Sequence, residues 1–137
     1  MTKRYANTAL IYAITAMILG VFYREFTKLN GFSGVTRLSV MHTHYFMLGM
    51  FFFLILMLLE KNFPFSNQKH AGKMVVIYHV GLNITGFGLF FRGITQALGT
   101  TLSRGLDASI SGISGSGHIL LGISIIYLLL QIKKQAA

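Results

Sequence analysis

The chain has 137 residues, of which 53 % are hydrophobic and only 11 % charged, and its formal net charge is +9. In a soluble domain about a quarter of the residues are charged, so this composition indicates a protein of the lipid bilayer. The 12 basic residues lie between long apolar runs instead of forming a stripe, which argues against nucleic acid as a partner. The absence of cysteine excludes disulfides, cysteine-ligated zinc, iron–sulfur clusters and covalently attached c-type haem.

Long uncharged runs predict four transmembrane helices, since each run approaches or exceeds the roughly 18 residues that span hydrocarbon. The runs are continuous rather than alternating, and so few segments could not close a β-barrel. Short connections make consecutive helices antiparallel neighbours. We therefore expect an all-α, integral membrane four-helix bundle with up-down topology and a single domain over residues 1–137. The helices are expected at approximately residues 5–24, 38–60, 71–93 and 108–132.

The basic residues between these helices predict the orientation of the chain. Seven lie on the side of the termini and five on the other side, which predicts a multi-pass protein of the cell membrane with both termini cytoplasmic. The first run has no convincing signal-peptide cleavage site, so we expect it to be retained. The seven are Lys3, Arg4, Lys61, Lys69, Lys73, Lys133 and Lys134, and the five are Arg24, Lys28, Arg37, Arg92 and Arg104.

Histidine provides the main functional signal, because four of the five histidines fall inside the predicted helices: His42, His44, His79 and His118. Ionisable groups at membrane depth cost free energy and usually face the bundle interior. Neutral imidazole is also the commonest metal ligand. Four such residues in one short chain favour a bound cofactor, while hydrogen bonding between helices is the simpler alternative. The fifth, His70, lies between Lys69 and Lys73 and is expected to be solvated.

Depth and direction decide which histidines could act together. At 1.5 Å per residue, His42, His44 and His118 lie at similar depths near the outer side, whereas His79 lies about 20 Å below the outer edge. At 100° per residue, His42 and His44 point about 200° apart, so they cannot both face one bundle axis. One of the two is thus expected to serve a second cofactor, a dimer contact or a hydrogen bond.

Several neighbouring residues could support a cofactor site. Small residues around His118 would let a flat ring or another helix approach closely. Asn83, one turn beyond His79, could orient that imidazole or tie two helices together, and Tyr12 could line the cavity. The outer arginines could pair with haem propionates, with snorkelling as the alternative. The small residues are Ser111, Ser114, Gly115 and Gly122, and the arginines are Arg37, Arg92 and Arg104.

The stretch from His42 to Gly49, an H-x-H followed by apolar residues and glycine, resembles a motif of haem–copper oxidase catalytic subunits and of nitric-oxide-response proteins. With residues 21–26 and 86–93, the chain also resembles a small uncharacterised four-helix family of Gram-positive bacteria. The oxidase likeness implies b-type haem held by histidines from different helices. In those proteins the two histidines of H-x-H can serve two haems, which matches the opposed directions of His42 and His44. This chain has no adjacent His-His pair for an active-site copper.

These observations predict a small b-type cytochrome for electron transfer, haem sensing or haem handling. Its cofactor would be haem b, with His118 and one of His44 or His42 as iron ligands. A copper-binding protein using His42, His44 and His118 is one alternative, since imidazole suits copper too. A structural or assembly subunit is another. The identity of a redox partner is left open, and a homodimer is possible. The sequence contains no paired carboxylates, Ser-His-Asp set or phosphate loop that would predict an enzyme.

Overall fold

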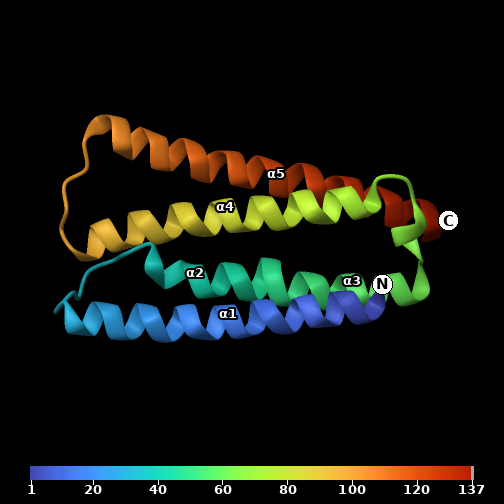
Figure 1. The fold of residues 1–137 in the computed structure, drawn as a ribbon, viewed down its shortest axis with the longest axis horizontal. Coiled ribbons are helices and arrows are strands. Elements are labelled where there is room, and N and C mark those ends of the chain that lie inside the picture. The colour runs from blue at the N-terminus through green and yellow to red at the C-terminus, as the bar shows by residue number, and fades with distance from the viewer. Residues whose placement is uncertain (137) are drawn as a thin grey trace.

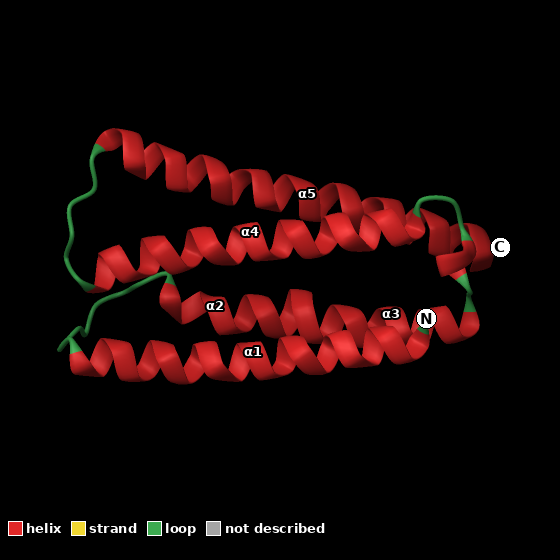
Figure 2. Cartoon of the chain, in the orientation of Figure 1, coloured by secondary structure: helices red, strands yellow, loops and turns green. Residues whose placement is uncertain are grey.

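The structure is a computed structural model that describes residues 1–136, and every regular element in that range is helical. Four long helices are joined by short loops, as Figure 2 shows, and each is long and apolar enough to cross a membrane. The predicted all-α four-helix fold is therefore confirmed. The elements are α1 (Thr2–Leu29), α2 (Leu38–His44), the π-helix η1 (Tyr45–Phe51), α3 (Phe52–Asn62), the 3-10 turn η2 (Phe65–Asn67), α4 (Ala71–Ala97) and α5 (Arg104–Ala136).

The long helices run beyond the predicted boundaries by several residues. The helix predicted over residues 5–24 is α1 and ends at Leu29, and the helix predicted from residue 108 is α5 and begins at Arg104. Charged and polar residues such as lysine and arginine have good helix propensity, so the helices continue past their apolar runs. A hydropathy pattern marks only the part of a helix that suits hydrocarbon.

The helices are antiparallel, and both termini lie at the same end of the molecule (Figure 1). Consecutive helices make the main contacts: α1 packs along the continuous helix α2–η1–α3, that helix contacts α4, and α4 packs extensively on α5. Contacts between α1 and α4 and between α2–η1–α3 and α5 are sparse. Two lateral faces of the bundle are thus left without close helix packing.

Glycine permits the close approach of α4 and α5. A methyl group added at Gly81 would lie 2.9 Å from the Gly117 carbonyl oxygen, and one added at Gly117 would lie 2.5 Å from Thr85 Oγ1. Small residues at such crossings let helix backbones meet directly, which is the usual mode of helix packing in membranes. This contact fixes the position of α5 and of the residues that it carries.

The first helix is aromatic on its inner face and aliphatic on its outer face. Tyr5, Ala9, Tyr12 and Ala16 are buried at helical spacing against the neighbouring helices. A large aliphatic surface facing outward is unusual for a soluble monomer and suits contact with lipid. Exposed side chains on this helix include Leu10, Ile14, Met17 and Val21.

The second long helix contains a π-helical segment, η1, between α2 and α3. In a π-helix the hydrogen bonds run from i to i+5, and the altered ladder leaves a carbonyl free to accept other bonds. The hydroxyl of Tyr78 on α4, which is fully buried, donates to the Leu48 carbonyl at 2.6 Å. The segment also passes close to α1, since a methyl group at Gly49 would lie 2.7 Å from Tyr12 Cβ.

Candidate functional site

The structure brings two of the predicted site residues together. His44 is the last residue of α2 and His118 lies in the middle of α5. Their imidazole ring centres are 6.4 Å apart, and the ring planes are perpendicular. The two rings therefore meet across the gap where α2–η1–α3 and α5 pack sparsely.

Each of these imidazoles is held by its own helix. His44 Nδ1 lies 2.9 Å from the Val40 carbonyl oxygen, and His118 Nδ1 lies 2.8 Å from the Ser114 carbonyl oxygen. A carbonyl oxygen can only accept, so both Nδ1 atoms carry the proton and donate it. In the neutral imidazole this leaves Nε2 with a free lone pair, which is the state of a metal-ligating histidine whose other nitrogen is bonded to a backbone carbonyl.

The surface around the histidine pair is open. A cavity of about 250 Å³ lies beside His44 and is lined by Thr43, Met47 and Leu48. The side chain of His118 is exposed. On the same helix, a methyl group added at Gly115 or Gly122 would meet nothing within 4 Å. Part of the predicted stripe of small residues thus borders open space, while Ser114 lies against Gly88 of α4.

The distance between the two ring centres is compatible with two imidazoles that bind one metal ion. Since an imidazole nitrogen binds a metal at about 2 Å, two imidazoles that bind one metal ion have ring centres at most about 6 to 6.5 Å apart. The ring centres of His44 and His118 have this separation. Haem supplies four nitrogens itself, so two protein ligands complete its coordination. In residues 1–136, no three side chains among His, Asp and Glu come close enough to hold a metal ion without such a group.

His42, the first histidine of the H-x-H, is directed at a different helix. It faces α1, where a methyl group added at Gly20 would lie 3.7 Å from His42 Cβ. Its Nδ1 is buried and has no hydrogen-bond partner in the described chain. His42 and His44 thus point to different helices, as the 100° rotation per residue requires. A copper site that uses both of them together with His118 is not assembled.

His79 belongs to a separate polar cluster. Its ring stacks on Phe53 with a centre separation of 4.7 Å, and its Nδ1 lies 2.6 Å from Tyr12 Oη. Asn83 Nδ2 donates to the His79 carbonyl at 2.8 Å and to Tyr12 Oη at 3.3 Å. Tyr45 Oη donates to Asn83 Oδ1 at 3.3 Å. Asn83 therefore orients the His79 ring through Tyr12 and does not touch the ring itself.

Arg37 and Arg92 lie toward the end of the bundle opposite the chain termini, and Arg92 already has partners. Its guanidinium forms an ion pair with Asp107 at 2.9 Å and donates to Ser111 Oγ at 2.8 Å. Arg37 caps the start of α2, and its backbone N–H donates to Gln96 Oε1. Sequence reasoning did not foresee the Arg92–Asp107 pair. The sequence does contain a signal for it, since Asp107 is the only aspartate in the chain and lies, like Arg92, near an end of the predicted connection.

Comparison with known proteins identifies the family. The chain belongs to the family described as Protein of unknown function (DUF2871), which matches residues 2–135. No curated protein and no solved structure matches the chain. The expected membership of an uncharacterised family covering nearly all of the chain is confirmed. These comparisons give no support for the likeness to haem–copper oxidases.

Proposed function

We propose that this DUF2871 protein is a small membrane haem protein in which His44 and His118 bind the iron of one haem b. The observation that carries the proposal is the histidine pair itself. Two imidazoles on different helices stand 6.4 Å apart, each with Nδ1 bonded to a backbone carbonyl and Nε2 free. Two neighbouring imidazoles with free Nε2 lone pairs are the protein ligands that one haem iron needs.

The exposure of His118 supports an occupant at this place. The residue lies on an apolar helix that is long enough to cross a membrane, and its side chain is exposed. An ionisable group in contact with lipid is costly, so such residues normally face a cavity, a partner group or a ligand. A flat, largely apolar ring bound between the two imidazoles would remove this cost.

In the structural alternative, histidines form hydrogen bonds between helices, and these two histidines form none within residues 1–136. Each makes its side-chain hydrogen bond within its own helix, to Val40 or to Ser114. His79, in contrast, bonds to Tyr12 on another helix. The interhelical role that histidines often play in membranes is therefore carried by His79, and His44 and His118 are free for a ligand.

When bound, haem would supply one-electron redox chemistry or gas binding. The residues of the chain would hold the ring and set its properties. The Nδ1–H bonds to carbonyls fix both imidazole planes and raise the basicity of the ligating nitrogens. Arg92 and Arg37 at the outer ends of α4 and α2 would attract carboxylates there. By the distribution of basic residues, both termini would be cytoplasmic.

The test is an absorbance spectrum of the detergent-purified full chain, produced with haem supplied, in the oxidised and dithionite-reduced states, together with iron and copper analysis. We expect a stoichiometric Soret band that shifts on reduction. His118→Ala should lose this haem, and added imidazole should restore binding by replacing the missing ligand. His70→Ala is the matched control, because His70 is exposed in the loop before α4. Full haem with an unchanged spectrum in His118→Ala would overturn the assignment.

A further inference from the structure

A second site lies away from the histidine pair, in a groove between α1 and α4 whose floor is the helix α2–η1–α3. We call it the α1–α4 groove. Its middle cavity has a volume of about 280 Å³ and is lined by Thr8, Ile11, Tyr12, Thr15, Tyr45, His79 and Asn83. Its outer cavity, of about 210 Å³, shares Thr15 and Tyr45 and is otherwise lined by Leu19, Met41, Gly86, Phe87 and Phe90.

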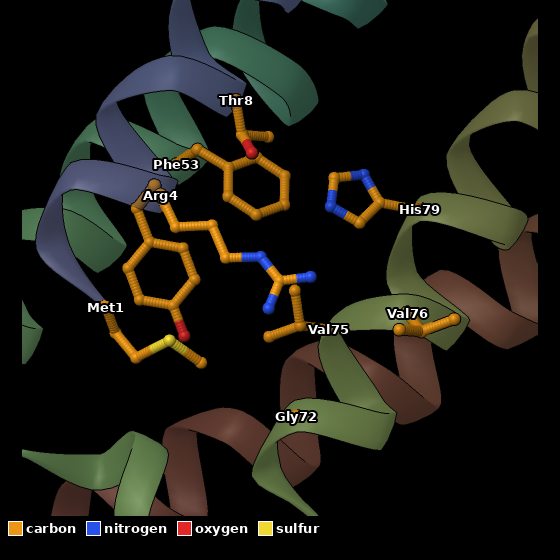
Figure 3. Close-up of a pocket in the computed structure, with 9 residues that line it drawn as sticks. Met1, Arg4, Thr8, Phe53, Gly72, Val75, Val76 and His79 are labelled. Atoms are coloured by element: carbon orange, nitrogen blue, oxygen red, sulfur yellow. The ribbon is translucent and has the colours of Figure 1, made fainter.

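The inner end of the groove lies near the chain termini. Figure 3 shows the His79 and Phe53 rings side by side there, with the Arg4 side chain extending below them. This inner cavity shares Thr8 and His79 with the middle cavity. Neighbouring cavities along the groove therefore share lining residues, with polar side chains in the middle cavity and mostly apolar ones in the outer cavity.

The direction of the hydrogen bonds in the groove can be derived. Asn83 Nδ2 bonds to the His79 carbonyl, which can only accept, so the orientation of the amide is fixed. The same Nδ2 donates to Tyr12 Oη, and the Tyr12 hydroxyl proton then goes to its other partner, His79 Nδ1. Nδ1 is thus an acceptor, and the neutral His79 ring carries its proton on Nε2.

The single free donor, His79 Nε2–H, favours a ligand that carries an acceptor. An N–H group in an apolar groove is costly when it has no acceptor. A lipid acyl chain offers no acceptor, so it would leave His79 Nε2–H unsatisfied. A quinone presents carbonyl oxygens on a flat ring and carries an apolar tail. Its ring suits the aromatic middle of the groove, and its tail suits the outer cavity with Leu19 and Phe90.

We propose that the α1–α4 groove binds a membrane quinone, with His79 Nε2–H donating to one quinone carbonyl oxygen. The groove shares no lining residue with the His44–His118 pair. The proposal therefore goes beyond haem binding and does not depend on it. The two can be tested separately on the same protein.

The experiment measures binding of a decyl-substituted benzoquinone to the detergent-solubilised full chain by isothermal titration, with and without haem. We expect saturable binding with one quinone per chain. His79→Phe should raise Kd about 3- to 10-fold, the loss expected for one hydrogen bond. Thr15→Phe should abolish binding, because it fills the junction of the two cavities while Thr15 bonds only to its own helix.

Ile14→Phe is the matched control, since it adds the same ring to the exposed face of α1. It should leave Kd unchanged. Absence of saturable binding, or equal Kd values for Thr15→Phe and the unaltered chain, would overturn the proposal. Photolabelling with an azidoquinone should mark peptides of α1 or α4, and label confined to α5 would also overturn it. Quinone binding by a chain that takes up no haem would refute only the haem assignment.

Discussion

Three histidines of this protein, His44, His118 and His79, occupy two contrasting regions. At the gap between α2 and α5, His44 and His118 are each bonded to their own helix and leave Nε2 free. Between α1 and α4, His79 is stacked on Phe53 and bonded to Tyr12 on another helix. The first pair holds no helices together, whereas the second region ties three long helices to one another.

The contrast shows that the role of a histidine in an apolar helix depends on the partners of its two ring nitrogens. The exposure of the side chain does not distinguish the two cases, because the exposed His118 bonds within its own helix and the partly buried His79 bonds to another helix. One nitrogen bonded within the helix and the other free describes a ligand. A nitrogen bonded to another helix describes a structural contact.

The largest effect should come from His44→Ala, which tests the first region. It should remove haem binding completely and lower the free energy of unfolding of the haem-free protein very little, since no interhelical bond is lost. Haem titration and denaturant unfolding in detergent would measure the two quantities. A haem-free His44→Ala protein that is strongly destabilised would show that His44 is a packing residue after all.

Gly117→Val should affect both regions. The added side chain would meet Thr85 Oγ1 and the Gly81 carbonyl oxygen, forcing α4 and α5 apart. Overpacking of this kind costs about 1–3 kcal/mol. It should also weaken haem binding, because α5 carries His118. Unfolding in detergent and the Soret absorbance check the two effects, and Gly122→Val, at a glycine with nothing within 4 Å, is the control.

Tyr12→Phe should lower stability without affecting haem binding, which is the reverse of the result expected for His44→Ala. It removes the hydroxyl that bonds to His79 and Asn83 while keeping the ring. Interhelical hydrogen bonds in membrane proteins contribute about 0.6 kcal/mol on average and up to about 1.7. The free energy of unfolding should fall by an amount in this range, with an unchanged haem spectrum. A changed spectrum would mean that the two regions are coupled.

The smallest effect should come from Asp107→Asn, which breaks the ion pair with Arg92 between α4 and α5, at the end of the bundle opposite the chain termini. The Asp107 side chain is 52 % exposed, so the pair is a surface salt bridge. Such pairs contribute about 0.2–1 kcal/mol and are screened by salt. The difference in unfolding free energy between variant and parent should therefore shrink in high salt. A difference that persists there would indicate a structural role beyond the ion pair.

The sequence predicted the parts of this structure that depend on composition and helical periodicity. Four apolar runs predicted the four helices, and a rotation of 100° per residue predicted that His42 and His44 cannot both face one bundle axis. The contact partner of each side chain could not be predicted from the sequence, because it depends on which helices pack together and on their relative height. Tyr12 and Phe53 lie on other helices than His79, and no spacing within one helix indicates their contact.

The π-helical segment η1 also had no signal in the sequence. Its Leu48 carbonyl accepts a hydrogen bond from Tyr78, a residue of another helix, and helical periodicity does not indicate this tertiary contact. The hydropathy of residues 38–62 is that of one uninterrupted apolar helix. Only the assembled bundle reveals where the helix departs from α geometry.

Because of this segment, the side chains of α2 and of α3 are rotated relative to each other about the axis of the second long helix. A π turn accommodates an additional residue relative to an α turn, so α2 with His44 and α3 with Phe53 do not follow one common α-helical wheel. Removing one residue within η1 would restore a common wheel and rotate α2 by about 100° relative to α3. Such a rotation would turn His44 away from His118 while α3 kept its place beside α1. The angular setting of the histidine pair thus depends on the length of this segment, independently of the side chains that surround it.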